Sequence, residues 1–184
     1  MLNVASSGRA RSSYFAAIPS ASSGNFDSVD RCGACVEITN GPTTIVATVV
    51  DACPEDTNPP CQSAGHLDLS TQAFDALGYA NGDPSGTTWQ FVACPVTGNI
   101  QARLKTGNVD QLYLTNVVFP IVAVKANGQP ATHLSYGAWQ LAGGAHAAGA
   151  TLTMTDVEGH AVTGTVPGGG GDVGAQFPSP GPCP

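Results

Sequence analysis

Short runs of β-branched and aromatic residues, separated by glycine and proline, are the feature that most limits how this chain folds. The sequence contains 23 glycines and 14 prolines in 184 residues, and charged residues make up only 10%. Glycine and proline interrupt helices and favour tight turns, whereas Val, Ile and Thr favour strands. The pattern therefore predicts an all-β fold of short strands.

The first clear hairpin follows Cys35. Residues 36–39 and 44–50 are rich in Val, Ile and Thr, and Asn40-Gly41-Pro42 between them is a turn signal. We expect these two runs to pair as neighbouring strands.

A short strand and a helix are expected further along the first half. Residues 66–69 alternate, so that the two leucines face one side and Asp68 faces the other. Ser70 is a suitable N-cap for a helix over residues 71–77, and Gly78 supplies its end. Asp68 is therefore expected to point away from the local core.

The second half of the sequence contains a series of short segments that are each typical of a β-strand. Asn127-Gly128 and Glu158-Gly159 are hairpin-type turns, and the spacing of the strands is typical of a β-sandwich. We place a domain boundary after residue 96, which gives domains of residues 1–96 and 97–184. The expected strands of the second domain are residues 100–104, 112–118, 121–125, 133–141, 151–156 and 161–166.

The charge distribution limits the partners. The net charge is −7, and residues 1–96 hold nine acidic and three basic side chains. An acidic surface of this kind disfavours nucleic acid. The longest apolar stretch, residues 117–124, is too short to cross a bilayer, so we expect no membrane partner. The first residues lack the pattern of a secretory signal, and we expect a mature form behind an added Met.

Six cysteines form an even set, which is typical of disulfides in a secreted protein. Fifteen pairings are open to six cysteines. Zinc is the alternative for Cys32-Gly33-Ala34-Cys35, but no second such pair or closely spaced histidine pair completes a tetrahedral site. We expect neither a metal nor a cofactor.

Two carboxylates stand out by their positions. Asp51 ends a β-rich run, and Asp68 lies on the outward side of the strand that leads into the predicted helix. An aspartate at a strand end is commonly a turn or capping residue, so position alone leaves a structural role open.

Eight segments of the sequence resemble microbial expansins. The first four occur in the same order as in the first expansin domain, and the last four resemble the second, cellulose-binding domain. The resemblance covers nearly the whole chain and implies a six-stranded double-psi β-barrel followed by an immunoglobulin-like β-sandwich, packed along one polysaccharide-binding face. The segments are residues 32–38, 49–55, 66–70 and 89–95, then 97–99, 103–107, 119–122 and 155–159.

The resemblance also implies a set of site residues. Asp68 matches the acidic residue that is essential for wall loosening, and Asp51 and Glu55 match residues of the same groove. In the second domain, Lys105 matches a basic residue that faces this groove, and Tyr136 matches one member of an aromatic row.

The aromatic row departs from the family. The adjacent Trp pair expected after Lys105 is missing, because residues 107–112 contain no aromatic side chain. We expect Tyr113 to compensate, and we expect Trp139 to be a core residue.

The family pattern implies two disulfides, Cys35 to Cys94 and Cys53 to Cys61. This leaves Cys32 with Cys183, a bond that would tie the tail to the first domain.

The implied activity is non-hydrolytic loosening of plant cell wall polysaccharide by a secreted monomer that is not an enzyme. Related family-45 endoglucanases are the alternative, but glycosidases normally need two carboxylates, and residues 1–26, where those enzymes carry the second, contain none. A carbohydrate-binding or defence protein on the same barrel is a further alternative. Cellulose, xyloglucan or xylan is the expected partner, because the acidic first half repels acidic polymers.

Overall fold

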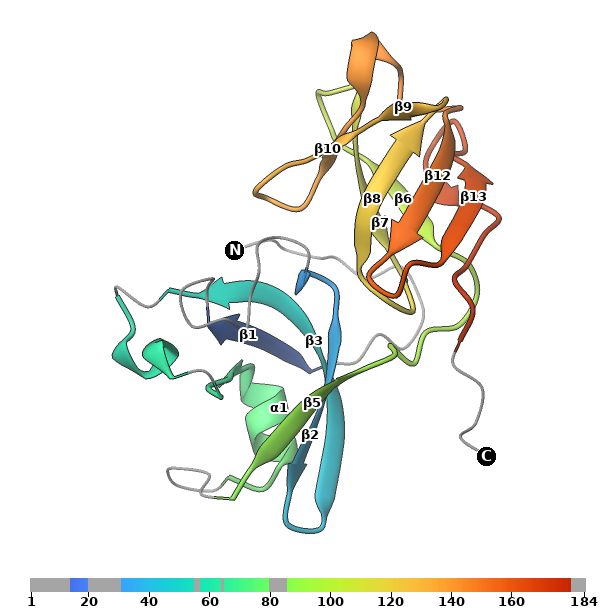
Figure 1. Ribbon diagram of the computed structural model, residues 1–184. Coiled ribbons are helices and arrows are strands. Elements are labelled where there is room, and N and C mark those ends of the chain that lie inside the picture. The colour runs from blue at the N-terminus through green and yellow to red at the C-terminus, as the bar shows by residue number, and fades with distance from the viewer. Residues whose placement is uncertain (1–13, 20–30, 55–56, 64, 80–85, 180–184) are drawn as a thin grey trace.

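The structure is a computed structural model that describes residues 14–19, 31–54, 57–63, 65–79 and 86–179. These residues form two lobes (Figure 1). Strands dominate both lobes, and the lower lobe also holds the helix α1, which confirms the all-β prediction. Within the described part of the chain, no helix has both the length and the apolar character needed to cross a bilayer.

The lower lobe is built on one sheet in the order β4-β1-β3-β2-β5. Strand β1 runs parallel to β3, and the other neighbours are antiparallel. The expected hairpin is confirmed, with Gly41 at a positive φ of 55° in the turn between β2 and β3. The strands are β1 (Phe15–Pro19), β2 (Cys35–Asn40), β3 (Thr43–Cys53), β4 (Asp68–Leu69) and β5 (Thr88–Val92).

The expected helix is also confirmed. Helix α1 (Thr71–Ala76) begins after Ser70, whose side chain accepts a hydrogen bond from the backbone N–H of Ala73. Gly78, with φ 78°, follows its last turn. Ala73 and Leu77 are buried, so the helix packs one apolar face against the sheet.

Two sheets form the upper lobe, and buried side chains of both contribute to one core. The first sheet has the order β10-β11-β7-β6-β14, and the second has the order β13-β12-β8-β9. Their strands are β6 (Gln101–Leu104), β7 (Gln111–Thr115), β8 (Ile121–Ala126), β9 (Gln129–Pro130), β10 (Thr132–His133), β11 (Trp139–Gln140), β12 (Thr151–Asp156), β13 (Ala161–Thr165) and β14 (Gly171–Asp172).

The prediction of a single strand over residues 133–141 of the upper lobe is wrong. Residues 133–141 instead hold the end of β10 and all of β11, joined by a turn in which Gly137 has φ 81°. The N–H of Gly137 donates to the carbonyl of Leu134, and this turn folds the chain back on itself. The sequence shows little sign of the break, because the turn needs only one glycine.

The two lobes have separate hydrophobic cores. Ile18, Ile38 and Val49 are fully buried in the lower core. Ala93 and Val96 already pack against the upper core, although Cys94 is bonded to Cys35 of the lower sheet. The chain thus changes cores shortly before the boundary that we place after residue 96, and the position of this boundary stays a prediction.

Two of the three expected disulfides are confirmed. Cys35 is bonded to Cys94, and Cys53 is bonded to Cys61. Cys183 lies outside the described residues, and Cys32 has a free thiol in the structure. The expected bond between them therefore involves a residue outside the described structure and stays a prediction.

A glycine on β13 provides a test of the upper lobe. A Cβ atom on Gly164 would overlap the carbonyl oxygen of Val173, which accepts a hydrogen bond from Thr165. We expect Gly164→Ala to force a backbone shift and to lower the free energy of unfolding by about 1 to 3 kcal/mol. Denaturant unfolding measures the change.

Gly168→Ala is the matched control, because a Cβ atom there meets no atom within 4 Å. Its effect is expected to stay within about 0.5 kcal/mol. Equal losses for the two variants would contradict the close approach of Val173 to β13.

Candidate functional site

Two carboxylates share one face of the lower sheet. Ala17 on β1 lies opposite Asp51 of β3 and also opposite Asp68 of β4. Side chains of paired residues point to the same face of a sheet, and neighbouring strands lie about 4.8 Å apart. Asp51 and Asp68 are therefore separated by one strand, with about 10 Å between their backbones.

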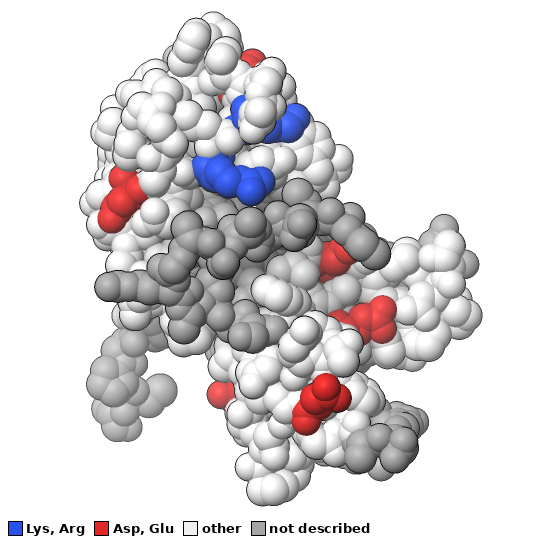
Figure 2. Space-filling model, turned by 180° about the vertical axis from the view of Figure 1, so that it is seen from behind, with Lys and Arg blue, Asp and Glu red and all other residues white. Residues whose placement is uncertain are grey.

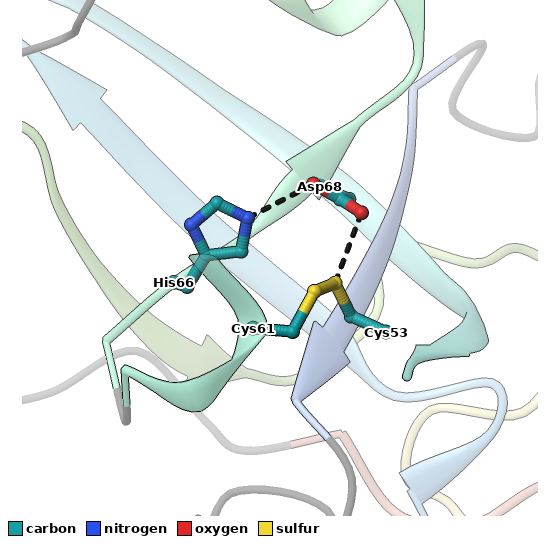
Figure 3. Close-up of side chains that lie close together, drawn as sticks. All are labelled: Cys53, Cys61, His66 and Asp68. Atoms are coloured by element: carbon teal, nitrogen blue, oxygen red, sulfur yellow. Dashed lines mark hydrogen bonds and ion pairs between the residues drawn. A yellow bond between two sulfur atoms is a disulfide. The ribbon is translucent and has the colours of Figure 1, made fainter. Parts of the chain in front are cut away.

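Asp68 is held at both carboxylate oxygens. Figure 3 shows its contact with His66 and its position beside the Cys53–Cys61 disulfide. His66 Nε2 lies 2.9 Å from Oδ1, and Asn58 Nδ2 donates to Oδ2 at 3.1 Å. The Sγ atom of Cys53 also lies 2.9 Å from Oδ2, but this sulfur is in a disulfide and has no proton to donate. The side chain of Asp68 remains 46% exposed, so the carboxylate is oriented and still open to a ligand.

The Cys53–Cys61 disulfide places Asn58 beside Asp68. It closes a short loop that ends in the 3-10 helix η3 (Pro59–Gln62), whose Cys61 donates a backbone hydrogen bond to the carbonyl of Asn58. Cys61 is fully buried. The proline-rich loop is thus fixed at both ends, and Asn58 is presented to the carboxylate.

Four potential metal ligands gather here, with donor atoms within 4.8 Å of one another: Cys53, Cys61, His66 and Asp68. The two sulfurs are bonded to each other, so neither is the thiolate that zinc binding requires. Only His66 and Asp68 remain as ligands, and two ligands do not fit a structural zinc site. The zinc alternative for Cys32 and Cys35 fails for the same reason, since Cys35 is bonded to Cys94.

Cys32 lies close enough to Asp51 to be influenced by it. Burial of the thiol group, and then the carboxylate of Asp51, raise the pKa of Cys32, even though part of the residue is exposed. The sulfur is therefore protonated at neutral pH and is a poor nucleophile.

Ser70 connects the strand that carries Asp68 to β1. Its Oγ accepts hydrogen bonds from Ala73 N and from Phe15 N, the latter at 3.1 Å. Its backbone N–H donates to the carbonyl of Phe15 at 2.9 Å. One serine thus caps the helix and fixes β1 against β4, which sets the register between Ala17 and Asp68.

A second group of predicted site residues lies together on the upper lobe. The Nζ atom of Lys105 lies 4.8 Å from the ring centre of Tyr136 and 3.4 Å from its hydroxyl. Tyr113 is covered in the same way by Arg103, whose guanidinium carbon is 4.9 Å from the ring centre. Arg103, Lys105 and Tyr113 line a hollow of about 370 Å³.

A chain of hydrogen bonds holds Tyr136 in place. The Tyr136 hydroxyl donates to Gln111 Oε1 at 2.9 Å, Gln111 donates to Gln140, and Gln140 donates to Asp110. Lys105 donates to the Tyr136 hydroxyl at the other end. Every donor points the same way, from the Lys105 ammonium group toward the Asp110 carboxylate. The chain fixes Tyr136 while leaving 45% of this residue exposed.

The other predicted residues have mixed outcomes. Glu55 lies outside the described residues. Trp139 is confirmed as a core residue, 4% exposed, with its ring stacked on His133. Asn58 and Arg103 were missed. Alternation along β6 could have revealed Arg103, which lies two residues before Lys105, whereas only the disulfide loop reveals Asn58.

Charged side chains are distributed unevenly over the face in Figure 2. Basic side chains gather near the middle of the upper lobe, whose edge and top also carry acidic side chains, and further acidic side chains lie on the lower lobe.

Comparison with known proteins identifies relatives of both lobes. No family model matches the sequence. Expansin-like protein 1 of Dictyostelium discoideum is 36% identical over 121 residues, which is 59% of this chain and 42% of that protein. Expansin-like protein 5 of the same organism is 32% identical over 122 residues, or 59% and 50%. The chain thus matches half or less of each of these relatives.

Two crystal structures of a Clavibacter michiganensis expansin share the fold. The apo form superposes with a TM-score of 0.68 at 26% identity, and an Asp-to-Asn mutant in complex with cellohexaose gives 0.69 at 25%. Each covers 90% of this chain, which covers 83% of theirs. These structures have a double-psi β-barrel domain and a β-sandwich domain, so the expected fold class is confirmed.

The two roles of Ser70 generate a prediction. We expect Ser70→Ala to lower the free energy of unfolding by about 1 to 2 kcal/mol, because it removes the helix cap and the bond to Phe15 together. Thermal and denaturant unfolding check this.

Thr71→Ala, one residue later, is the control. Thr71 is exposed, so its replacement is expected to change stability by less than about 0.5 kcal/mol. If Ser70→Ala lowers the free energy of unfolding by no more than Thr71→Ala does, the side chain of Ser70 does not join β1 to α1 as described.

Proposed function

Because the chain is an expansin-like protein in sequence and fold, we propose that it loosens plant cell wall polysaccharide without hydrolysing it. Asp68 is the central residue of this function, and Asp51 belongs to the same groove. Glu55, outside the described residues, is assigned to the groove by family resemblance alone. Lys105, Tyr113 and Tyr136 extend the binding surface onto the second domain. The relatives and the complex of the bacterial neighbour with cellohexaose support a cellulose-type ligand.

The observation that carries the proposal is the state of Asp68. Its carboxylate is fixed by Asn58 and His66, yet almost half of its side chain is exposed. Each carboxylate oxygen can accept more than one hydrogen bond, so both retain capacity for a ligand on the exposed side. An oriented carboxylate on an open face is suited to accept hydrogen bonds from sugar hydroxyls.

Loosening of this kind requires no covalent step. Glucan chains in a wall adhere through hydrogen bonds and apolar packing, and a protein that binds a separated chain more tightly than a packed one shifts the equilibrium toward separation. Asp51 lies on the same face as Asp68, so one sugar chain could contact both carboxylates. The free energy of binding to the protein then offsets the adhesion between neighbouring glucan chains.

Hydrolysis is disfavoured by the composition of β1. An acid–base pair needs a second carboxylate placed across the scissile bond from the first. The strand between Asp51 and Asp68, Phe15–Pro19, contains no acidic residue, and Ala17 occupies its central position. Asp51 is about 10 Å away by backbone spacing, which is far from the separation of about 5 to 5.5 Å between the carboxyl groups of retaining glycosidases but near the roughly 6.5 to 9.5 Å of inverting ones. Hydrolysis is therefore disfavoured by the composition of β1 and not by the position of Asp51, and the release of sugar is the deciding measurement.

The binding surface of the second domain is proposed to stack sugar rings on tyrosine. Tyr136 presents an exposed ring, and Tyr113 lies beside the hollow formed with Lys105. Aromatic faces match the C–H faces of pyranose rings. Cellulose, xyloglucan and xylan are the proposed partners of a monomeric protein that acts outside the cell, where its disulfides persist.

Asp68→Asn is the direct test. The substitution keeps the shape of the side chain and removes its charge, so we expect loss of most of the wall-loosening activity with little change in stability. Extension of wall strips under load and the tensile strength of paper measure the activity. Wild-type activity in this variant would show that Asp68 is not the central residue.

Asp75→Asn is the matched control, since Asp75 is an exposed carboxylate on α1 of the same lobe. It should retain full activity. Reducing-sugar release from amorphous cellulose, measured in parallel, separates the two mechanisms. Sugar released in proportion to loosening would support an endoglucanase instead, and binding without either effect would support a carbohydrate-binding or defence protein.

A further inference from the structure

Four side chains that carry sulfur, nitrogen and oxygen donors converge at the β4 edge of the lower sheet (Figure 3). The donor atoms of Cys53, Cys61, His66 and Asp68 all lie within 4.8 Å of one another. The side chains of His66 and Asp68 are 27% and 46% exposed, whereas both cysteines are buried. The cysteines thus form the buried part of the group, and His66 and Asp68 form the part that solvent reaches.

The oxidation state of the two sulfurs decides what this group can bind. In the disulfide neither sulfur is a thiolate, which leaves only two metal ligands. Two electrons and two protons break the S–S bond and give two thiols, and the thiol or phosphine that supplies the electrons is itself oxidised. The group then offers two sulfurs, one imidazole nitrogen and one carboxylate oxygen. These are four ligands of the three kinds that zinc binds, in the number that a tetrahedral site requires.

Asn58 supplies the outer contacts that orient the ligands of a metal site. Its Nδ2 lies 3.5 Å from the sulfur of Cys53 and 3.1 Å from Oδ2 of Asp68. N–H groups that donate to ligand atoms fix the direction of those ligands toward the metal. One amide group therefore contacts a sulfur ligand and the carboxylate ligand together.

We infer that the chain with its Cys53–Cys61 pair reduced binds one divalent cation of the zinc class through Cys53, Cys61, His66 and Asp68. Both thiols release their protons to solvent as the cation binds, so the complex contains two thiolates, one neutral imidazole and one carboxylate. The metal ion replaces the S–S bond as the link across the loop. It also occupies an oxygen of Asp68 that the oxidised chain leaves open to a ligand.

Metal binding and disulfide formation are thus alternative uses of the same two sulfurs. A reducing compartment keeps them as thiols, and an oxidising compartment joins them. The inference goes beyond the proposed loosening of wall polysaccharide and does not depend on it. Metal binding by the reduced chain is measured without any polysaccharide, so the two proposals fail or succeed separately.

The other cysteines must be separated from this group in a test, because reduction also breaks the Cys35–Cys94 bond. Within the part of the chain that the structure describes, no second group of three or more such ligands forms. Cys35 and Cys94 therefore lack the partners that complete a site. Replacement of Cys32 and Cys183 by serine removes the remaining two thiols.

The test uses the full chain with Cys32→Ser and Cys183→Ser, in an oxidised form and in a form reduced by a phosphine. Cobalt(II) is the probe, because its absorption spectrum reports thiolate ligands and tetrahedral coordination. We expect the reduced form to bind one equivalent of cobalt with both spectral features, and zinc to displace it. The oxidised form should bind at least about a hundredfold more weakly, because it lacks both thiolates.

Substitutions then assign the other two ligands. His66→Gln and Asp68→Asn should each weaken zinc binding by the reduced form by about tenfold or more, and Asn58→Ala by about tenfold. His146→Gln and Asp75→Asn are controls matched in chemistry, since both residues are exposed and lie outside the group. Each control should change the affinity by less than about twofold.

Three results would overturn the inference. The first is a reduced form without thiolate absorption on addition of cobalt, and the second is equal binding by the oxidised form. The third is that His66→Gln and Asp68→Asn bind as tightly as the two controls. This third result is also what a reduced chain that has lost its fold would give, because such a chain holds metal through its thiols alone.

Discussion

The pairing of β1 between β3 and β4 is the constraint on which the candidate site depends. Asp51 and Asp68 are distant in sequence and lie on different strands, and they share a face only because both are opposite Ala17. A slip of one residue in either pairing would turn one carboxylate to the other face of the sheet. Buried Ala16 and Ile18 hold the register from the core side, and Ser70 holds it from the end of β1.

On the upper lobe, long polar side chains are ordered on an open surface by contacts with tyrosine rings. Arg103 and Lys105 lose rotamer freedom when they lie over tyrosine rings, and the cation–π contacts offset part of this cost. The two lobes thus present complementary chemistry. The lower lobe offers acceptors for sugar hydroxyls, and the upper one offers donors and apolar faces.

Local features of this protein were predictable from sequence, and features that depend on distant contacts were not. The cap at Ser70, the turn at Gly41 and the outward direction of Asp68 follow from neighbouring residues, so propensity and alternation were sufficient. The importance of Asp68 came from family resemblance. The role of Asn58 depends on a disulfide and a loop, and the contact between Lys105 and Tyr136 spans 31 residues, so no local pattern could indicate either one.

The one-way chain of donors from Lys105 to Asp110 has an electrical consequence. In Tyr136, Gln111 and Gln140 the oxygen end of each dipole faces the ammonium group and the hydrogen end faces the carboxylate. The aligned dipoles therefore solvate both terminal charges, much as water would, and each polarises the next. Two opposite charges that never touch are in this way linked through three neutral side chains. Replacing the Asp110 carboxylate would remove the last acceptor of the row and so weaken the contacts that position Tyr136, although that ring lies at the other end.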